Sequence, residues 1–119
     1  MQHHKKVLRV GLTLGDPGGI GPDLVLNALM HRHFRKRIKF TVFGADSILK
    51  KRIEALPEET QVHAKKAISH HHIVGNQTKI SESFTAGKAS KEGGIQSLES
   101  LDHALEHFAS NDYDVLVTA

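Results

Sequence analysis

A short turn rich in glycine and proline constrains the fold more than any other feature of the sequence. Residues 10–24 read VGLTLGDPGGIGPDL. An apolar run at residues 7–14 stops at this turn, and residues 23–29 are strongly apolar again. This change of pattern predicts a buried strand, a tight turn and a helix. Glycine in such a turn permits positive φ or the close approach of another backbone or a ligand, while proline fixes φ.

The turn has two interpretations. Pro22 suits the start of a helix and Asp23 suits the positive end of its dipole, so free N–H groups can face an anion there. The turn can equally be only a tight connection. The phosphate-binding patterns do not decide, because no Lys-Ser or Lys-Thr follows a glycine and Leu24 stands where a third glycine is required. Asp16 is expected either to bond its own turn backbone or to contact a ligand where strands end.

Strands and helices alternate along the rest of the chain. We predict helices at residues 22–33, 46–56 and 91–110, with Asp46 and Ser90 as N-caps of the last two, and strands at residues 40–43 and 113–118. Residues 57–91 show weak periodicity and are predicted to form a long connection with one or two short strands near residues 71–74. On the last helix an apolar stripe is expected to face the sheet: Ile95, Leu98, Leu101, Leu105 and Phe108. This order predicts an α/β fold with a mostly parallel sheet.

Composition and charge exclude several classes of function. The absence of cysteine excludes disulfides, thiolate metal sites and a cysteine nucleophile. The net charge of +3 is modest, but the pI near 9.3 invites a nucleic-acid interpretation. However, the basic residues gather at the chain start and around the end of the first predicted helix, where the dipole favours cations, and no basic-aromatic interleaving is present. We therefore expect no nucleic acid partner. Because no apolar run is long enough for a signal or a membrane span, we expect no membrane partner and a cytoplasmic location.

The ten histidines do not form a metal-binding pattern. His103 and His107 lie one turn apart, but they fall opposite the apolar stripe and are expected to face solvent. The segment His70-His71-His72 alternates if extended, so one strand face presents at most two of them. No metal ligand and no catalytic residue is assigned within the chain. His3 and His4 can be native or the remnant of a tag.

Three stretches resemble one enzyme family. GDPGGIGPD at residues 15–23 resembles the opening motif of the 4-hydroxythreonine-4-phosphate dehydrogenase family, and is more distantly similar to the openings of isocitrate and isopropylmalate dehydrogenases. AGKASKEGG at residues 86–94 resembles the family's G-K-x-S-x-x-x-G segment, and DVLVTA at residues 114–119 resembles the strand that enters V-T-A-P-I-N-K. The resemblance implies that residues 1–119 are the N-terminal α/β segment of a larger dehydrogenase. Its partial parallel or mixed sheet with flanking helices would belong to an isocitrate/isopropylmalate dehydrogenase-like two-domain fold.

For the full-length enzyme, the resemblance implies NAD-dependent oxidation and decarboxylation of 4-phosphohydroxy-L-threonine in the synthesis of pyridoxal 5'-phosphate (vitamin B6). It also implies a phosphorylated small-molecule substrate, a homodimer, and a divalent metal cation whose histidine ligands lie beyond Ala119. The segment by itself is expected to be inactive. The residues expected on the cofactor side of the cleft are Gly15, Asp16, Ile20 and Gly21, and Thr118 is expected to approach the pocket.

Two alternatives stay open. One is a related dehydrogenase acting on another phosphorylated or vicinal hydroxy acid. Within that class, Pro17 argues against an enzyme of the isocitrate or isopropylmalate type, because the residue inserted after Asp16 resembles the vitamin B6 enzyme. The other is a non-catalytic binding module, which would be a stable short protein without large exposed apolar patches.

Overall fold

A sheet of four parallel strands organises the part of the chain that the computed structural model describes, residues 7–119. The expectations for residues 1–6, including His3 and His4, lie outside the described residues. The elements in chain order are β1 (Leu8–Thr13), α1 (Gly21–Met30), α2 (Arg32–Arg35), β2 (Ile38–Gly44), α3 (Asp46–Glu54), α4 (Glu58–Ile68), β3 (His72–Gly75), α5 (Lys91–Ala109) and β4 (Val115–Thr118).

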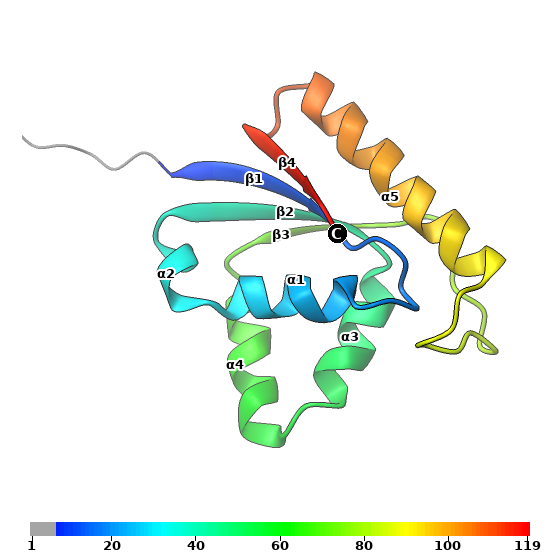
Figure 1. Ribbon diagram of the computed structural model, residues 1–119. Coiled ribbons are helices and arrows are strands. Elements are labelled where there is room, and N and C mark those ends of the chain that lie inside the picture. The colour runs from blue at the N-terminus through cyan, green and yellow to red at the C-terminus, as the bar shows by residue number, and fades with distance from the viewer. Residues whose placement is uncertain (1–6) are drawn as a thin grey trace, which may run out of the picture.

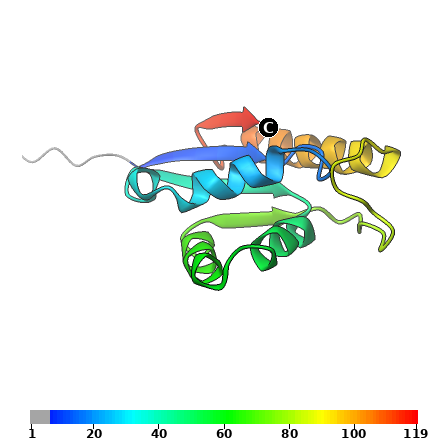
Figure 2. The same ribbon diagram turned by 60° about the horizontal axis from the view of Figure 1, so that its bottom comes forward.

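The strand order in the sheet is β3-β2-β1-β4, so β1 and β2 are central. Helices α1, α3 and α4 cover one face of the sheet, and α5 lies across the other (Figures 1 and 2). The predicted α/β class with a parallel sheet is confirmed. None of the helices in the described residues combines the length and apolar character needed to cross a membrane.

The main core lies between the central strands and the three helices on one face. The later half of β1 is buried, as is most of β2, because both faces of these strands are covered. Across from them, α1 buries Val25, Leu26 and Leu29. The other buried residues of this core are Val10, Leu12, Leu14, Phe40, Val42, Leu49, Ile53 and Ala64.

The predicted helix at residues 22–33 is two helices. Helix α1 ends at Met30 because His31 is extended, with φ −72° and ψ 119°. The His31 side chain then accepts a hydrogen bond from the His33 N–H at 3.3 Å and caps the short α2. The basic residues that follow therefore do not lie in the last turn of α1, where the dipole argument placed them. They lie on α2 and on the approach to β2.

Helix α4 was missed by the sequence analysis, which predicted a long connection after residue 57. Its two buried residues, Ala64 and Ala67, are small and give a weak hydrophobic signal. Charge was the better indicator, because Glu58 and Glu59 occupy the first turn and Lys65 lies in the last, as the helix dipole favours. The predicted short strand near residues 71–74 is confirmed as β3.

The predicted orientation of α5 is wrong. The buried residues on this helix are Gly93, Gln96, Ser100 and Ala104, whereas much of the apolar stripe is exposed. Exposed fractions on the stripe are 44% for Ile95, 65% for Leu98, 50% for Leu105 and 48% for Phe108. His103 and His107 are half-buried rather than solvated.

The predicted Ser90 N-cap of α5 is confirmed, because its side chain accepts a hydrogen bond from the Gly93 N–H at 3.0 Å. Asp46 is the first residue of α3 and makes no capping bond.

Two sets of contacts with residues outside the helix explain this orientation of α5. Tyr113, which is fully buried, lies beneath the helix and donates its hydroxyl to the Ala104 carbonyl. Its ring lies against Gly11 of β1, where an added Cβ would be 2.7 Å from the ring. The Asn76 amide also bonds Gln96 and Ser100, which places polar side chains on the inner face of α5. Small and polar residues therefore face the sheet because these contacts need short, specific side chains.

His71 gives the fold a predicted dependence on acid. Its Nδ1 accepts the Phe40 N–H at 3.1 Å, so the bonded ring is neutral with its proton on Nε2. Burial lowers the pKa of His71, and the neighbouring charges of His70, Lys39 and Arg35 act in the same direction, against the Leu29 carbonyl.

Because the folded pKa is depressed, the unfolded chain binds the proton first. Stability is then complete above the unfolded pKa of about 6.5 and falls as the pH decreases toward the folded value. Urea midpoints measured across this range should decrease toward acid for the unmodified chain and decrease less for His71→Asn, whose amide oxygen can accept the same N–H. His72→Asn, on the exposed face of β3, is the control and should keep the slope. Equal slopes for His71→Asn and the unmodified chain would contradict this role.

Candidate functional site

The carboxyl ends of all four strands meet at one edge of the sheet, because the strands are parallel. β1 leads into the glycine turn at residues 14–21, and the Leu14 N–H bonds the Phe43 carbonyl at the end of β2. The Asn76 N–H bonds the Gly44 carbonyl, and the Ala119 N–H bonds the Thr13 hydroxyl at 3.2 Å. Open α/β sheets bind ligands at this carboxyl edge, so it is the candidate site.

Asp16 shapes the glycine turn. Its Oδ1 accepts the Gly18 N–H at 2.8 Å, and its carbonyl accepts the Gly19 N–H at 2.9 Å. The expected Asx-type bond to the turn backbone is therefore confirmed. These bonds also use two of the N–H groups that the anion interpretation left free.

The glycines at the two ends of the turn are required by the chain's own backbone. Gly15 has φ +70°, and a Cβ there would lie 2.4 Å from the Ala119 carbonyl oxygen. A Cβ on Gly21 would lie 2.1 Å from the Leu14 carbonyl oxygen. The close approach that the sequence predicted is thus made by protein backbone, so these two positions are explained without a ligand.

The three stretches that carry the family resemblance come together at this edge. The Gly87 N–H donates to the Gly18 carbonyl at 2.7 Å, which joins the connection before α5 to the glycine turn. Gly93, in the first turn of α5, approaches Asp16 so closely that an added Cβ would lie 2.3 Å from Oδ1. The Asp16 carboxylate therefore lies beside the positive end of α5, where a negative charge is stabilised. Ala119 completes the cluster against Gly15.

The four residues expected on the cofactor side occupy different environments. Gly15 and Gly21 are buried, and Asp16 is half-buried. Ile20 is 73% exposed at the beginning of α1, and is the side chain of the four most available to another molecule. Thr118 is exposed at the end of β4. The assignment of these residues to a cofactor stays a prediction.

A polar network that the sequence analysis did not find holds the neighbouring connection in place. The Asn76 amide donates to the Gln96 side chain at 2.8 Å, and Gln96 donates to the Thr78 carbonyl at 2.6 Å. Glu99 accepts the N–H groups of Gln77 and Thr78, and hydrogen bonding by Thr78 is the main reason that the pKa of Glu99 is lowered. Because these partners are 18 to 24 residues apart, no local sequence pattern indicates them.

Two cavities lie along the connection between β3 and α5. One, of about 330 Å³, lies between the start of α3 and residues 76–80 and includes Asp46, Asn76 and Lys79. The other, of about 210 Å³, is lined by residues 83–92, including Lys88 and Glu92. Within residues 7–119, no group of three or more potential ligands is placed to hold a metal ion. The described residues therefore do not fit the implied divalent cation.

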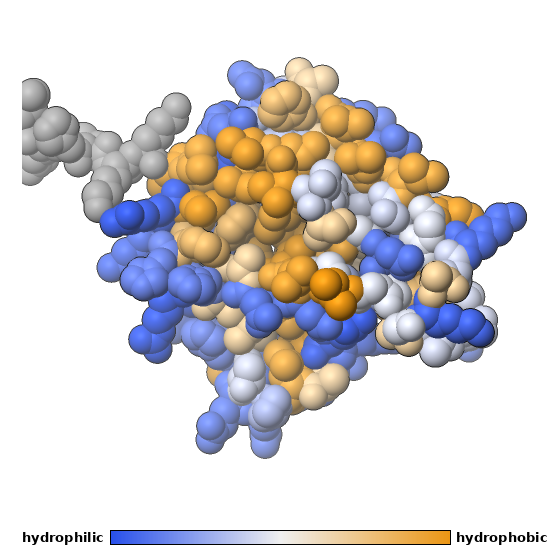
Figure 3. All heavy atoms as spheres, viewed as in Figure 1, coloured by the Kyte–Doolittle hydropathy of each residue, from blue (hydrophilic) through white to orange (hydrophobic). Residues whose placement is uncertain are grey.

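Apolar side chains are exposed along β4 and at the amino end of β1. Val115 and Val117 of β4 are 43% and 45% exposed, and Leu8 of β1 is 42% exposed. Together with the outer side of α5 they form the apolar surface seen over β1, β4 and α5 (Figure 3). A free-standing binding module was expected to lack such a patch, so this surface weighs against that alternative.

Comparisons with known proteins agree with the three stretches. The chain is 31% identical over 113 residues to a 4-hydroxythreonine-4-phosphate dehydrogenase from Burkholderia vietnamiensis, which covers 94% of this chain and 33% of that protein. It is 29% identical over 112 residues to the enzyme of this name from Thermosynechococcus vestitus, covering 94% of this chain and 32% of that protein. The resemblance to the 4-hydroxythreonine-4-phosphate dehydrogenase family is confirmed. No family model matches the chain.

The chain spans about a third of the length of these curated relatives. Solved structures agree on the fold. A 4-hydroxythreonine-4-phosphate dehydrogenase from Burkholderia phymatum superposes with a TM-score of 0.74 at 17% identity, over 95% of this chain and 36% of that one. A terephthalate 1,2-cis-dihydrodiol dehydrogenase from Burkholderia xenovorans gives 0.66 at 20% identity, over 93% of this chain and 33% of that one. The expected relation to this dehydrogenase fold is confirmed.

Proposed function

We propose that this chain forms part of an NAD-dependent dehydrogenase that oxidises and decarboxylates 4-phosphohydroxy-L-threonine in pyridoxal 5'-phosphate synthesis. The observation that carries the proposal is the meeting of the three family-like stretches at the carboxyl edge of the sheet, where Gly18 bonds Gly87 and Gly15 lies against Ala119. The likeness to enzymes of that name over nearly the whole chain supports the substrate class.

Within the proposed enzyme, the described residues build one wall of the ligand cleft. Asp16 fixes the turn by its bond to Gly18, and the connection held by Asn76 and Gln96 closes one side. NAD, when bound, would supply the acceptor for the hydride that leaves the carbon bearing the substrate hydroxyl, while the hydroxyl loses its proton. Gly15, Asp16, Ile20 and Gly21 are proposed on the cofactor side, with Ile20 as the exposed apolar contact. A divalent cation, a homodimer and a cytoplasmic location belong to the same proposal.

The test begins with the native protein from the source cells, captured by an antibody raised against residues 7–119. We expect it to form NADH from NAD and 4-phosphohydroxy-L-threonine when a divalent cation is added. An Ile20→Asp variant of that protein should raise the KM for NAD, while Val62→Asp, also at an exposed position but on α4, should not. No NADH from correctly folded native protein would contradict the proposal.

The polypeptide of residues 1–119 provides a second measurement. We expect it to show no NAD-dependent turnover, because the described residues place no metal-binding group at the edge. Measurable turnover by this polypeptide would contradict that expectation.

A related dehydrogenase acting on another phosphorylated or vicinal hydroxy acid is the second candidate, since the same fold also occurs in a dihydrodiol dehydrogenase. NADH formation from such acids, but not from 4-phosphohydroxy-L-threonine, would favour it.

A further inference from the structure

A basic cavity lies at the opposite edge of the sheet from the glycine turn. Its volume is about 530 Å³, larger than the 330 Å³ cavity at the carboxyl edge. It is bordered by α2, by the residues that lead into the amino end of β2, and by α4. The lining residues are Arg32, His33, Arg35, Lys36, Arg37, His63 and Lys66. The two edges are separated by the length of β2, roughly 20 Å for its seven residues.

Among the described residues, no acidic side chain pairs with the charges in this cavity. None of its lining residues is acidic, and no ion pair found within residues 7–119 engages its arginines or lysines. Glu59 lies one turn before His63 on α4, but does not line the cavity. The positive field reaches neighbouring groups, because Arg35 helps to lower the pKa of His71. Collecting like charges costs free energy, and an anion bound among them would remove that cost.

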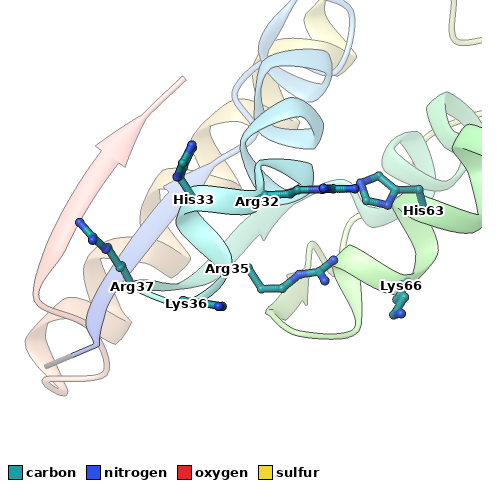
Figure 4. Close-up of a pocket in the computed structure, with 7 residues that line it drawn as sticks. All are labelled: Arg32, His33, Arg35, Lys36, Arg37, His63 and Lys66. Atoms are coloured by element: carbon teal, nitrogen blue, oxygen red, sulfur yellow. The ribbon is translucent and has the colours of Figure 1, made fainter. Parts of the chain in front are cut away.

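The side chains do not all point the same way. Arg32 extends from α2 toward His63 of α4, and Arg35 reaches into the space between the two helices (Figure 4). Lys66 follows His63 along α4 on the other wall. His33 and Arg37 project on the other side of α2 (Figure 4). Arg35 and His63 are half-buried, so the inner part of the cavity is partly shielded from solvent.

We infer that this cavity binds a small anion with two or more phosphoryl groups, held by Arg32, Arg35 and Lys66. The guanidinium group is a planar fork that matches phosphate oxygens in pairs, and lysine adds a point charge. Cations on two facing helices suit an anion with separate charged groups better than a single phosphate. This inference concerns a different edge from the proposed dehydrogenase site and does not depend on it.

A small anion fits the cavity better than a nucleic acid does. Proteins that bind single strands combine a basic groove with aromatic side chains on which bases stack. The lining residues here include no phenylalanine, tyrosine or tryptophan. The basic residues surround a cavity between two short helices instead of following an extended stripe across the surface.

The test uses inorganic tripolyphosphate and isothermal titration calorimetry on the whole chain at an ionic strength of about 0.15 M. We expect saturable binding with one site. The double variant Arg32→Gln/Arg35→Gln should weaken it roughly tenfold or more, because charge-assisted bonds are lost. The control Lys50→Gln/Lys51→Gln removes the same charge from the exposed side of α3, outside this cavity, and should change the affinity less than about twofold.

Further measurements separate a specific anion site from a general effect of net charge. If the arginine double variant does not fold, Lys66→Gln on the opposite wall should weaken binding in its place. If Arg32→Gln/Arg35→Gln and the control Lys50→Gln/Lys51→Gln weakened tripolyphosphate binding equally, net charge alone would explain the affinity. That result would overturn the inference. Single-stranded RNA or DNA binding far more tightly than tripolyphosphate would overturn it too. NADH formation by the native protein, measured with Arg32→Gln/Arg35→Gln, should be unchanged, so failure of one proposal does not imply failure of the other.

Discussion

Gly21→Ala is expected to destabilise the fold by about 3 kcal/mol or more, because its new Cβ would overlap backbone. The methyl group would lie 2.1 Å from the Leu14 carbonyl oxygen and 3.4 Å from the Ala119 Cβ. A flexible side chain could rotate away, but the Leu14 carbonyl belongs to the backbone directly after β1, where Leu14 is buried. The clash can be relieved only if α1 moves away from the sheet and the glycine turn opens.

The measurement is the denaturant midpoint of residues 1–119 with and without the substitution. Gly94→Ala is the matched control, since a Cβ added at this glycine of α5 would meet no atom within 4 Å. Alanine there should stabilise the helix by about 0.5–1 kcal/mol. If Gly21→Ala were as stable as the unmodified chain, the close packing of the turn on β1 would be wrong.

The part of the fold around the glycine turn was predictable because its signals are local. An apolar strand, a turn with Pro17 and Pro22, and an apolar helix follow one another within a few residues, and backbone chemistry alone links them. The same holds for the Ser90 cap and for the strand ending at Thr118. Sequence order also predicts the parallel sheet, since helices between strands provide the crossovers.

Helix α5 shows where sequence periodicity fails. The apolar stripe correctly predicts a helix, but a stripe does not say what it packs against. The inward face was decided by distant partners, namely Asn76 for Gln96 and Tyr113 for Ala104. Within residues 7–119, much of the stripe is exposed on the outer side of α5, as are the apolar residues Val115 and Val117 of β4. Periodicity therefore indicates a surface that is suited to burial, and here that surface lies away from the sheet.

Only part of the candidate site could be predicted from the sequence, because only that part has local sequence signals. The glycine turn and Asp16 were found by their backbone requirements, and the structure confirms the Asx-type bond. The Asn76–Gln96 network was not found, because it joins residues 20 apart with no shared motif. The basic cavity was interpreted as the solvated end of a helix, because the break at His31 was not visible in the sequence. Those charges line one cavity only because α2 and α4 border the same space in the fold.

Phe43→Ala is expected to cost about 3–5 kcal/mol, the second large effect. Phe43 is fully buried at the end of β2, with ring centroids 5.1 Å from His107 and 5.8 Å from Tyr113. It forms the contact between the sheet and α5, so its loss leaves a cavity beneath that helix. Amide exchange should therefore accelerate in α5 more than in α1, which packs on the opposite face of the sheet.

Leu105→Ala is the control that separates the two orientations of α5. Leu105 is 50% exposed, so its truncation should change stability by only about 0.5 kcal/mol. If the apolar stripe faced the sheet, as periodicity alone suggests, the same change would cost about 2–5 kcal/mol. A large loss for Leu105→Ala together with a small loss for Phe43→Ala would therefore reverse the orientation of α5. It would also remove the Asn76–Gln96 contacts from the candidate site, because both depend on which face of this helix meets the sheet.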